Sequence, residues 1–187
     1  MQTLYSEPLP ATLDVRTAGL RGTVVRGFLA LGNLPRFCES LASERGRAEI
    51  SCSFFRDDES RSIVVVQVRA DVQVVCQRCL DIMTVMVASE SELAIVADDD
   101  QARLLPRRLG PLIVEGEECN LWELAEDELI LSLPIVSYHD GVSCRKLPDY
   151  PNSDERELAQ AENPFKVLEQ LKSIQVKQEP GDGSTEK

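Results

Sequence analysis

The stretch that decides the fold runs from residue 62 to residue 87 and reads SIVVVQVRADVQVVCQRCLDIMTVMV. Its first half alternates between apolar and polar side chains, which is the pattern of a strand with one buried face. The apolar positions are Val64, Val66, Val68, Ala70, Val72, Val74 and Cys76. Residues 80–87 are again β-rich, and only Cys76-Gln77-Arg78-Cys79 separates the two segments. A connection this short joins neighbouring antiparallel strands, so the stretch predicts a long hairpin.

More strands are predicted before this hairpin. Residues 23–26 form a β-branched segment bounded by Gly22 and Gly27, and residues 48–54 alternate with apolar side chains at the even positions. Residues 34–42 place apolar side chains at helical spacing, which predicts a short helix between the two strands. Consecutive strands should therefore pair as an antiparallel meander, in a sheet that could curl into a barrel-like form.

A longer helix is predicted over residues 121–133. Asn120 is a suitable N-cap, Glu123 stands three positions later, and Pro134 ends the segment. The apolar face consists of Leu121, Leu124, Ala125, Leu129 and Leu131. Glu123, Glu126 and Asp127 are expected on the solvated side. The pattern predicts an α+β fold in which this helix covers the antiparallel sheet, within a single domain spanning residues 1–150.

Glu128 interrupts the apolar face of this helix, because it projects between Leu124 and Leu131. An unpaired carboxylate is costly to bury, so Glu128 needs a partner or a place at the rim of the core. Arg78 is our hypothesis for that partner, since it lies near Cys76, which has the parity of the buried valines.

The C-terminal part of the chain differs in character. Residues 151–175 are predicted to form an acidic linker and an amphipathic C-terminal helix that begins at Asn163-Pro164. Its apolar face consists of Phe165, Leu168, Leu171 and Ile174. This helix could dock in a partner's groove or pack on its own domain. Residues 176–187 combine proline and glycine with charged side chains and are expected to be disordered.

The charge of the chain is strongly negative and uneven. It has 187 residues with 20 Lys and Arg against 32 Asp and Glu, a formal net charge of -12. This acidity argues against DNA and membrane surfaces as partners, since binding to them draws on clusters of Lys and Arg. An uninterrupted apolar run of about 18 residues, which a transmembrane helix needs, is missing from the sequence. Residues 1–56 contain seven Arg and five acids, whereas residues 97–187 contain ten basic and twenty acidic side chains.

The arginines of the first third could face RNA. Arginine suits phosphate because its planar guanidinium binds two oxygens, and the candidates are Arg16, Arg21 and Arg26, joined by Arg78. The alternative is that they are ordinary solvated side chains on a half-exposed sheet, because aromatic residues do not interleave with them.

Cys76-Gln77-Arg78-Cys79 is the sharpest local motif. Two cysteines at this spacing can bind one metal ion or form a redox disulfide. Zinc needs two more ligands, and His139 and Cys144, about sixty residues away, are available. A thioredoxin-like role would require a following helix, whereas a β-rich segment follows here. The third alternative is a core cysteine at position 76, with Cys79 filling the turn.

Catalytic motifs are missing from the sequence. It contains no Gly-rich phosphate loop, no Gly-x-Ser-x-Gly and no His-Glu-x-x-His. His139-Asp140 and Cys144 could supply a base and a nucleophile, but nothing fixes an orienting group or an oxyanion hole. We therefore expect no enzyme. Six cysteines fall short of a disulfide scaffold and no signal peptide precedes them, so we expect a cytoplasmic protein.

Three separated motifs carry a resemblance to a known family. They are Cys76-Gln77-Arg78-Cys79-Leu80 after a valine-rich strand, the EDELILSLP run of residues 126–134 leading to His139-Asp140, and Asn163-Pro164-Phe165-Lys166-Val167-Leu168. In this order and spacing they resemble the YceD family, the bacterial large ribosomal RNA subunit accumulation proteins. With Val15-Arg16-Thr17-Ala18, the resemblance reaches from the N-terminal region to about Lys172. It implies a cytoplasmic, non-enzymatic factor that supports synthesis, processing or stability of large-subunit ribosomal RNA.

We therefore expect a ribosome-biogenesis factor for large-subunit (23S) ribosomal RNA. It would bind the RNA through its arginines or basic ribosomal proteins through its acidic half. Further expected contacts are Glu128, Phe165, Leu168 and Leu171. The alternative is a small zinc-binding or thiol-redox protein that uses Cys76 and Cys79. A site made of Cys76, Cys79, His139 and Cys144 would hold a structural zinc, because four protein ligands leave no open coordination position. The oligomeric state is left open.

Overall fold

The computed structural model describes residues 5–140 and Cys144. The chain divides into two units, residues 1–146 and residues 147–187, and all of the described residues belong to the first. The predicted linker and helix of residues 151–175, with Phe165, Leu168 and Leu171, lie outside the described residues, as does the segment 176–187.

Strands make up most of the regular structure in this unit. The elements are β1 (Thr12–Asp14), α1 (Val15–Arg21), β2 (Val24–Ala30), a 3-10 turn (Leu31–Asn33), α2 (Pro35–Cys38), β3 (Arg47–Arg56), β4 (Ser62–Val75), β5 (Ile82–Val96), α3 (Asp99–Arg103), β6 (Gly110–Ile113), β7 (Glu118–Asn120) and α4 (Leu121–Ser132). None of the helices in the described residues is long and apolar enough to cross a membrane.

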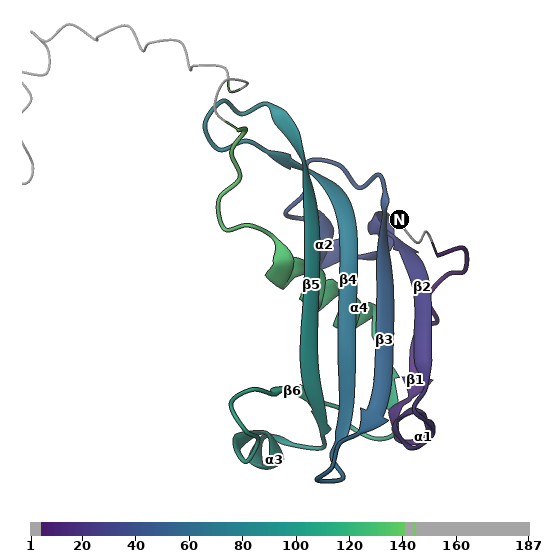
Figure 1. Cartoon of the computed structure of the whole chain (residues 1–187). Coiled ribbons are helices and arrows are strands. Elements are labelled where there is room, and N and C mark those ends of the chain that lie inside the picture. Colours follow the sequence, from purple (N-terminus) through teal and green to yellow (C-terminus); the bar gives the residue numbers. More distant parts are fainter. Residues whose placement is uncertain (1–4, 141–143, 145–187) are drawn as a thin grey trace, which may run out of the picture. The chain divides into compact units, whose positions relative to one another are not determined.

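The larger sheet has the strand order β2-β3-β4-β5-β6. Its first four strands pair antiparallel in chain order, and β6 adds parallel to β5 (Figure 1). β1 and β7 form a separate antiparallel pair. The α+β class and the antiparallel meander are confirmed. The sheet stays open, because β2 and β6 are its two edges and do not pair with each other.

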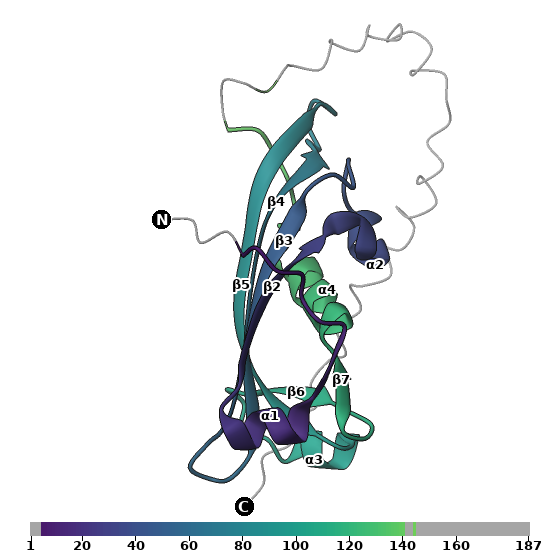
Figure 2. The same ribbon diagram turned by 90° about the vertical axis from the view of Figure 1, so that its right-hand side faces the viewer.

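The inner face of the β4–β5 hairpin lies against α4, which covers one side of the sheet (Figure 2). The alternation read from the sequence is present in β4: the inward side chains are buried and the outward ones, such as Gln67 and Arg69, are exposed. On the helix, Leu121, Ala125 and Leu129 are fully buried. Burying the apolar faces of both elements in one layer is the main stabilising term of this fold.

The start of α4 follows the prediction, but its buried face does not. The Asn120 side chain accepts hydrogen bonds from the amides of Trp122 and Glu123, at 3.0 and 3.3 Å. Leu131, expected in the core, is 77% exposed, and Glu126, expected in solvent, is 4% exposed. Both assignments were wrong because these positions lie at the margins of the apolar face, where tertiary contacts decide which side chain is covered.

Glu126 is buried because it caps another helix. The sequence predicted a helix over residues 34–42, whereas α2 is a single turn that begins after Leu34 without a side-chain cap of its own. The Glu126 carboxylate accepts from the backbone amides of Arg36 and Phe37 at 2.8 and 3.1 Å, and the Arg36 guanidinium lies 2.9 Å away. A carboxylate at a helix N-terminus satisfies free amides and favours the helix dipole.

β2 continues through Gly27, where the sequence prediction ended it. The segment before β1 runs beside the strand at this point and forms a parallel bridge, in which the Leu9 amide donates to the Phe28 carbonyl at 3.0 Å. A Cβ on Gly27 would lie 2.6 Å from the backbone nitrogen of Leu9. The glycine is therefore needed for a close backbone approach rather than for a turn.

Replacing the cap should cost much more stability than replacing its neighbour. Glu126→Ala leaves two amides of α2 without a partner in the interior, so we expect a loss of about 2 kcal/mol in the free energy of unfolding. Asp127→Ala removes only an exposed ion pair with Arg36, which should cost about 0.5 kcal/mol or less. Urea unfolding of both variants measures the difference, and equal losses would contradict the capping role.

Candidate functional site

The Cys-x-x-Cys motif forms the turn between β4 and β5. The amide of Leu80 donates to the carbonyl of Cys76 at 2.9 Å, and the amide of Cys76 donates to the carbonyl of Asp81 at 2.9 Å. Leu80 has a φ of 63°, a left-handed conformation that is unfavourable for a branched side chain. Cys76 is fully buried, and its side chain points to the same face as the buried valines of β4, as the sequence predicted.

A second segment reaches this turn from the end of α4. The amide of Gln77 donates to the carbonyl of Ser137 at 2.9 Å, and the guanidinium carbon of Arg78 lies 5.3 Å from the centre of the Tyr138 ring. These contacts bring the chain after Leu133 beside the hairpin tip, although the two segments are about sixty residues apart in sequence.

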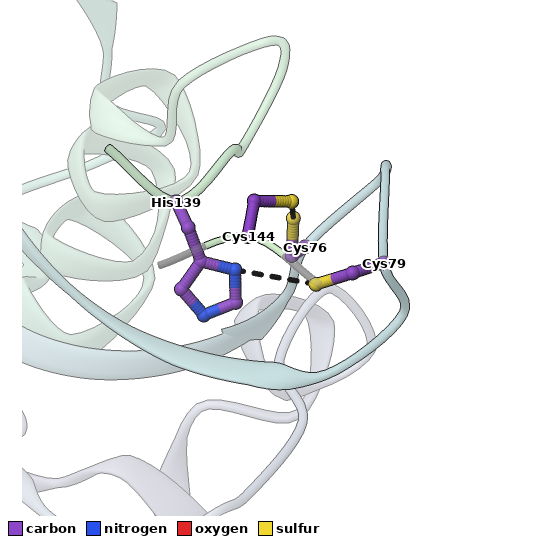
Figure 3. Close-up of side chains that lie close together, drawn as sticks. All are labelled: Cys76, Cys79, His139 and Cys144. Atoms are coloured by element: carbon purple, nitrogen blue, oxygen red, sulfur yellow. Dashed lines mark hydrogen bonds between the residues drawn. The ribbon is translucent and has the colours of Figure 1, made fainter. Parts of the chain in front are cut away.

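His139 and Cys144 join the two motif cysteines at this place (Figure 3). The Sγ of Cys76 lies 3.8 Å from the Sγ of Cys144, and the Sγ of Cys79 lies 3.3 Å from Nδ1 of His139. One donor atom from each of these four residues falls within 4.8 Å of all the others. The structure thus gathers the complete ligand set that the sequence suggested.

The thiols of this cluster differ in acidity. Burial tends to raise the pKa of Cys76, but hydrogen bonds from the backbone amides of Cys79, Arg78 and His139 outweigh it and lower the pKa to about 5. Burial, followed by the neighbouring cysteines, raises the pKa of Cys144 to about 11. The turn therefore favours a thiolate at Cys76.

The candidate RNA-binding arginines do not form one patch. Arg16 and Arg21 lie on α1, and Arg16 is 3.5 Å from Glu117. Arg26 is exposed on β2. Gly19 of α1 lies beside Ser62 at the start of β4, whereas Arg78 follows the other end of that strand. The 14 residues of β4 separate these two positions by about 45 Å.

Glu128 has partners other than the one proposed from the sequence. Its carboxylate is 4% exposed and accepts hydrogen bonds from the hydroxyls of Ser89, at 3.2 Å, and Ser91. Arg78 instead contacts Tyr138, so the hypothesis of an Arg78–Glu128 pair was wrong. Because its carboxylate is buried and hydrogen-bonded, Glu128 is not available to an external partner. The two serines interrupt the inward parity of β5, which was the signal that could have identified them.

An acidic hollow of about 310 Å³, absent from the sequence prediction, lies where β6, β7 and α4 meet. Its lining includes Leu112, Glu115, Glu118, Glu123, Leu124 and Asp127. The four acidic side chains are exposed, Leu112 is partly exposed, and Leu124 belongs to the buried core. They come from three short stretches, so the charge runs in the sequence did not show that they would converge.

Comparison with known proteins identifies the family of this chain. The family model described as "Large ribosomal RNA subunit accumulation protein YceD" matches residues 64–172. The chain belongs to the YceD family. The YceD protein of Haemophilus influenzae, also called a large ribosomal RNA subunit accumulation protein, is 33% identical over 174 residues, which cover 88% of this chain and 96% of that protein. No solved structure matches the chain. The resemblance read from the sequence is confirmed.

The span matched by the YceD model includes β5, α4 and all four residues of the cysteine-histidine cluster. It leaves out α1 and β2, which carry Arg16, Arg21 and Arg26. The cluster and the acidic hollow both lie within the part of the chain that the family model matches.

Double-mutant cycles should separate the observed partners of Glu128 from the one inferred from the sequence. Glu128→Ala and the pair Ser89→Ala/Ser91→Ala remove the same hydrogen bonds, so their effects on the free energy of unfolding should couple by about 1 kcal/mol. Glu128→Ala and Arg78→Ala should be additive within about 0.5 kcal/mol. Chemical unfolding of the single and combined variants measures both couplings, and the opposite ranking would refute this assignment.

Proposed function

We propose that this chain supports the accumulation of large-subunit (23S) ribosomal RNA, as a non-enzymatic factor that acts by binding. The observation that carries the proposal is its relation to the YceD family, together with its 33% identity to a protein of that name along 96% of that protein's length. A relation over nearly the whole relative, rather than over a single motif, supports a shared role.

The surface chemistry favours a basic protein segment as the direct partner. Glu115, Glu118, Glu123 and Asp127 line one hollow, and Asp127 is already paired with Arg36. A Lys or Arg that enters the hollow could lay its aliphatic stem on Leu112 while its charged head reaches the three glutamates. Basic segments of ribosomal proteins have this chemistry. The net charge of -12 also speeds the encounter with a cationic partner.

Direct contact with RNA is the less favoured mode. Phosphate binding requires several cations within reach of one backbone, whereas Arg16 and Arg78 lie at opposite ends of β4. Arg16 is in addition within 3.5 Å of Glu117, whose charge partly offsets its own. A binding site for RNA would have to use Arg26 and its neighbours on the uncovered side of the sheet.

Loss of the protein should reduce large-subunit ribosomal RNA. Deleting its gene should lower the ratio of large-subunit to small-subunit ribosomal RNA, measured on total RNA, and a plasmid copy should restore it. An unchanged ratio in the deletion strain would refute the proposed function.

Charge reversal in the hollow should abolish this restoration. Glu115→Lys combined with Glu118→Lys should weaken binding of a basic segment by about tenfold or more, which is about 1.4 kcal/mol. The matched control is Asp99→Lys with Asp100→Lys on α3, which makes the same change in net charge outside the hollow. The readout is the ribosomal RNA ratio in the deletion strain, with a thermal melt to verify folding.

A photo-crosslinking residue identifies the partner class. Placed at Glu118, it should recover a basic ribosomal protein, and placed at Arg26 it should recover little. Recovery of ribosomal RNA from position 26, with nothing from position 118, would overturn the choice of a protein partner while leaving the role in RNA accumulation intact.

A further inference from the structure

We propose that Cys76, Cys79, His139 and Cys144 bind one zinc ion, and that this ion is structural: it ties the tip of the β4–β5 hairpin to the segment that follows α4. This inference goes beyond the proposed function and does not rest on it.

The spacing of the donor atoms fits a tetrahedral zinc site. With Zn–S bonds of about 2.3 Å and Zn–N bonds of about 2.0 Å, two sulfurs on one zinc lie about 3.8 Å apart, and a sulfur and a nitrogen about 3.5 Å apart. The observed separations are 3.8 Å between Cys76 and Cys144 and 3.3 Å between Cys79 and His139. All four donor atoms lie within 4.8 Å of one another, so the wider pairs need to close by only about 1 Å to form the edges of one tetrahedron.

The donor set itself indicates zinc. Three cysteine sulfurs and one imidazole nitrogen are the ligands of a common structural zinc site, and thiolates disfavour magnesium and calcium, which prefer oxygen. Four protein ligands fill the tetrahedron, so no coordination position remains for water or substrate. The site is therefore suited to holding structure rather than to catalysis.

A core cysteine does not explain this arrangement. Burial accounts for Cys76, which continues the inner face of β4, but Cys79, His139 and Cys144 are only partly buried. Thiols are weak hydrogen-bonding groups, so three of them gain little from meeting at one point. The left-handed Leu80, at a cost of about 1 kcal/mol or more, directly follows Cys79. A bound ion would offset that strain.

A redox disulfide fits the geometry less well. A disulfide joins only two sulfurs, whereas four side chains gather here, and one of them is a histidine. A disulfide between Cys76 and Cys79 would also leave His139 and Cys144 without a role, whereas zinc uses all four residues.

The segment after α4 leaves its large apolar side chains largely in solvent. Ile135 is 96% exposed, and Val136 and Tyr138 are about half exposed. A hollow of about 600 Å³, lined by residues such as Val74, Leu80 and Leu133, lies between this segment and the body of the domain. Its contacts with the hairpin tip include one backbone hydrogen bond from Gln77 to Ser137 and the stacking of Arg78 on Tyr138. Metal ligation at both ends of this contact would fix the segment in place.

Metal analysis of the full-length chain tests the site directly. Protein expressed in zinc-supplemented medium, with any affinity tag removed, should contain one zinc per chain by mass spectrometry. Cys79→Ser and His139→Gln should each weaken zinc binding at least tenfold, measured by competition with a chromophoric chelator. The matched control is Cys38→Ser, because Cys38 lies outside the cluster and its Sγ donates to the Leu31 carbonyl at 3.0 Å, which a serine can also do.

Two results would overturn the site. One is a chain that, reduced and folded, binds no zinc on titration. The other is a full equivalent of zinc in both the Cys79→Ser and the His139→Gln variants. Substitution by cobalt(II) tests the ligand set further: the thiolate-to-metal charge-transfer absorption should fall in Cys144→Ser and stay unchanged in Cys38→Ser. An unchanged absorption in Cys144→Ser would refute ligation by Cys144.

Hydrogen exchange tests the structural role. Removing zinc with a chelator should raise exchange at least tenfold in residues 76–81 and 133–140, while β3 in the interior of the sheet should keep its protection. Uniform protection with and without zinc would overturn the role of the ion in holding the segment. None of these measurements uses ribosomal RNA, so their failure is distinguishable from failure of the proposed function.

Discussion

The inner face of β4 requires a cover, because its alternating valines would otherwise expose a continuous apolar stripe to water. α4 provides that cover, and its position against the β4–β5 hairpin determines most of what surrounds it. It brings Glu126 to the start of α2, sets Glu128 against Ser89 and Ser91, and directs the following chain toward the hairpin tip. The cysteine-histidine cluster is thus a product of the same packing that forms the core.

The sequence was informative where one periodicity dominated. The period of two in residues 62–76 identified β4 and the depth of Cys76, and Asn120 marked the start of α4. Features that depend on contacts between distant segments were missed. No local signal shows that Glu126 replaces a missing cap on α2, that the backbone of Leu9 packs closely on Gly27 of β2, or that β6 joins the sheet in parallel. For the cluster, the ligands could be named, but their convergence could not be derived from spacing alone. The pairing of Arg78 with Glu128 failed because two neutral serines satisfied the carboxylate.

The acidic hollow and the cysteine-histidine cluster lie at opposite ends of the long β4–β5 hairpin. The acidic hollow is lined by residues of β6, β7 and the first turns of α4, whereas the cluster joins the hairpin tip to the chain beyond α4. Figure 2 shows β6 and β7 toward the end of the hairpin opposite its tip. Because of this separation, the cluster can hold the chain after α4 to the hairpin tip while the acidic hollow at the other end stays free to bind a partner. Variants at one end should therefore report on that end alone, since sites far apart without shared partners are energetically independent.

The cap of α2 by Glu126 also bears on the order in which the molecule can form. The two residues joined by the shortest of its amide contacts are 90 positions apart in the chain, so this helix start stays incomplete while the polypeptide is emerging from a ribosome. The valine face of β4 likewise has no cover until residues 121–132 have been synthesised. During that interval the nascent chain exposes an aggregation-prone strand. Closure of the core is thereby a late event of synthesis, coupled to the arrival of a single helix.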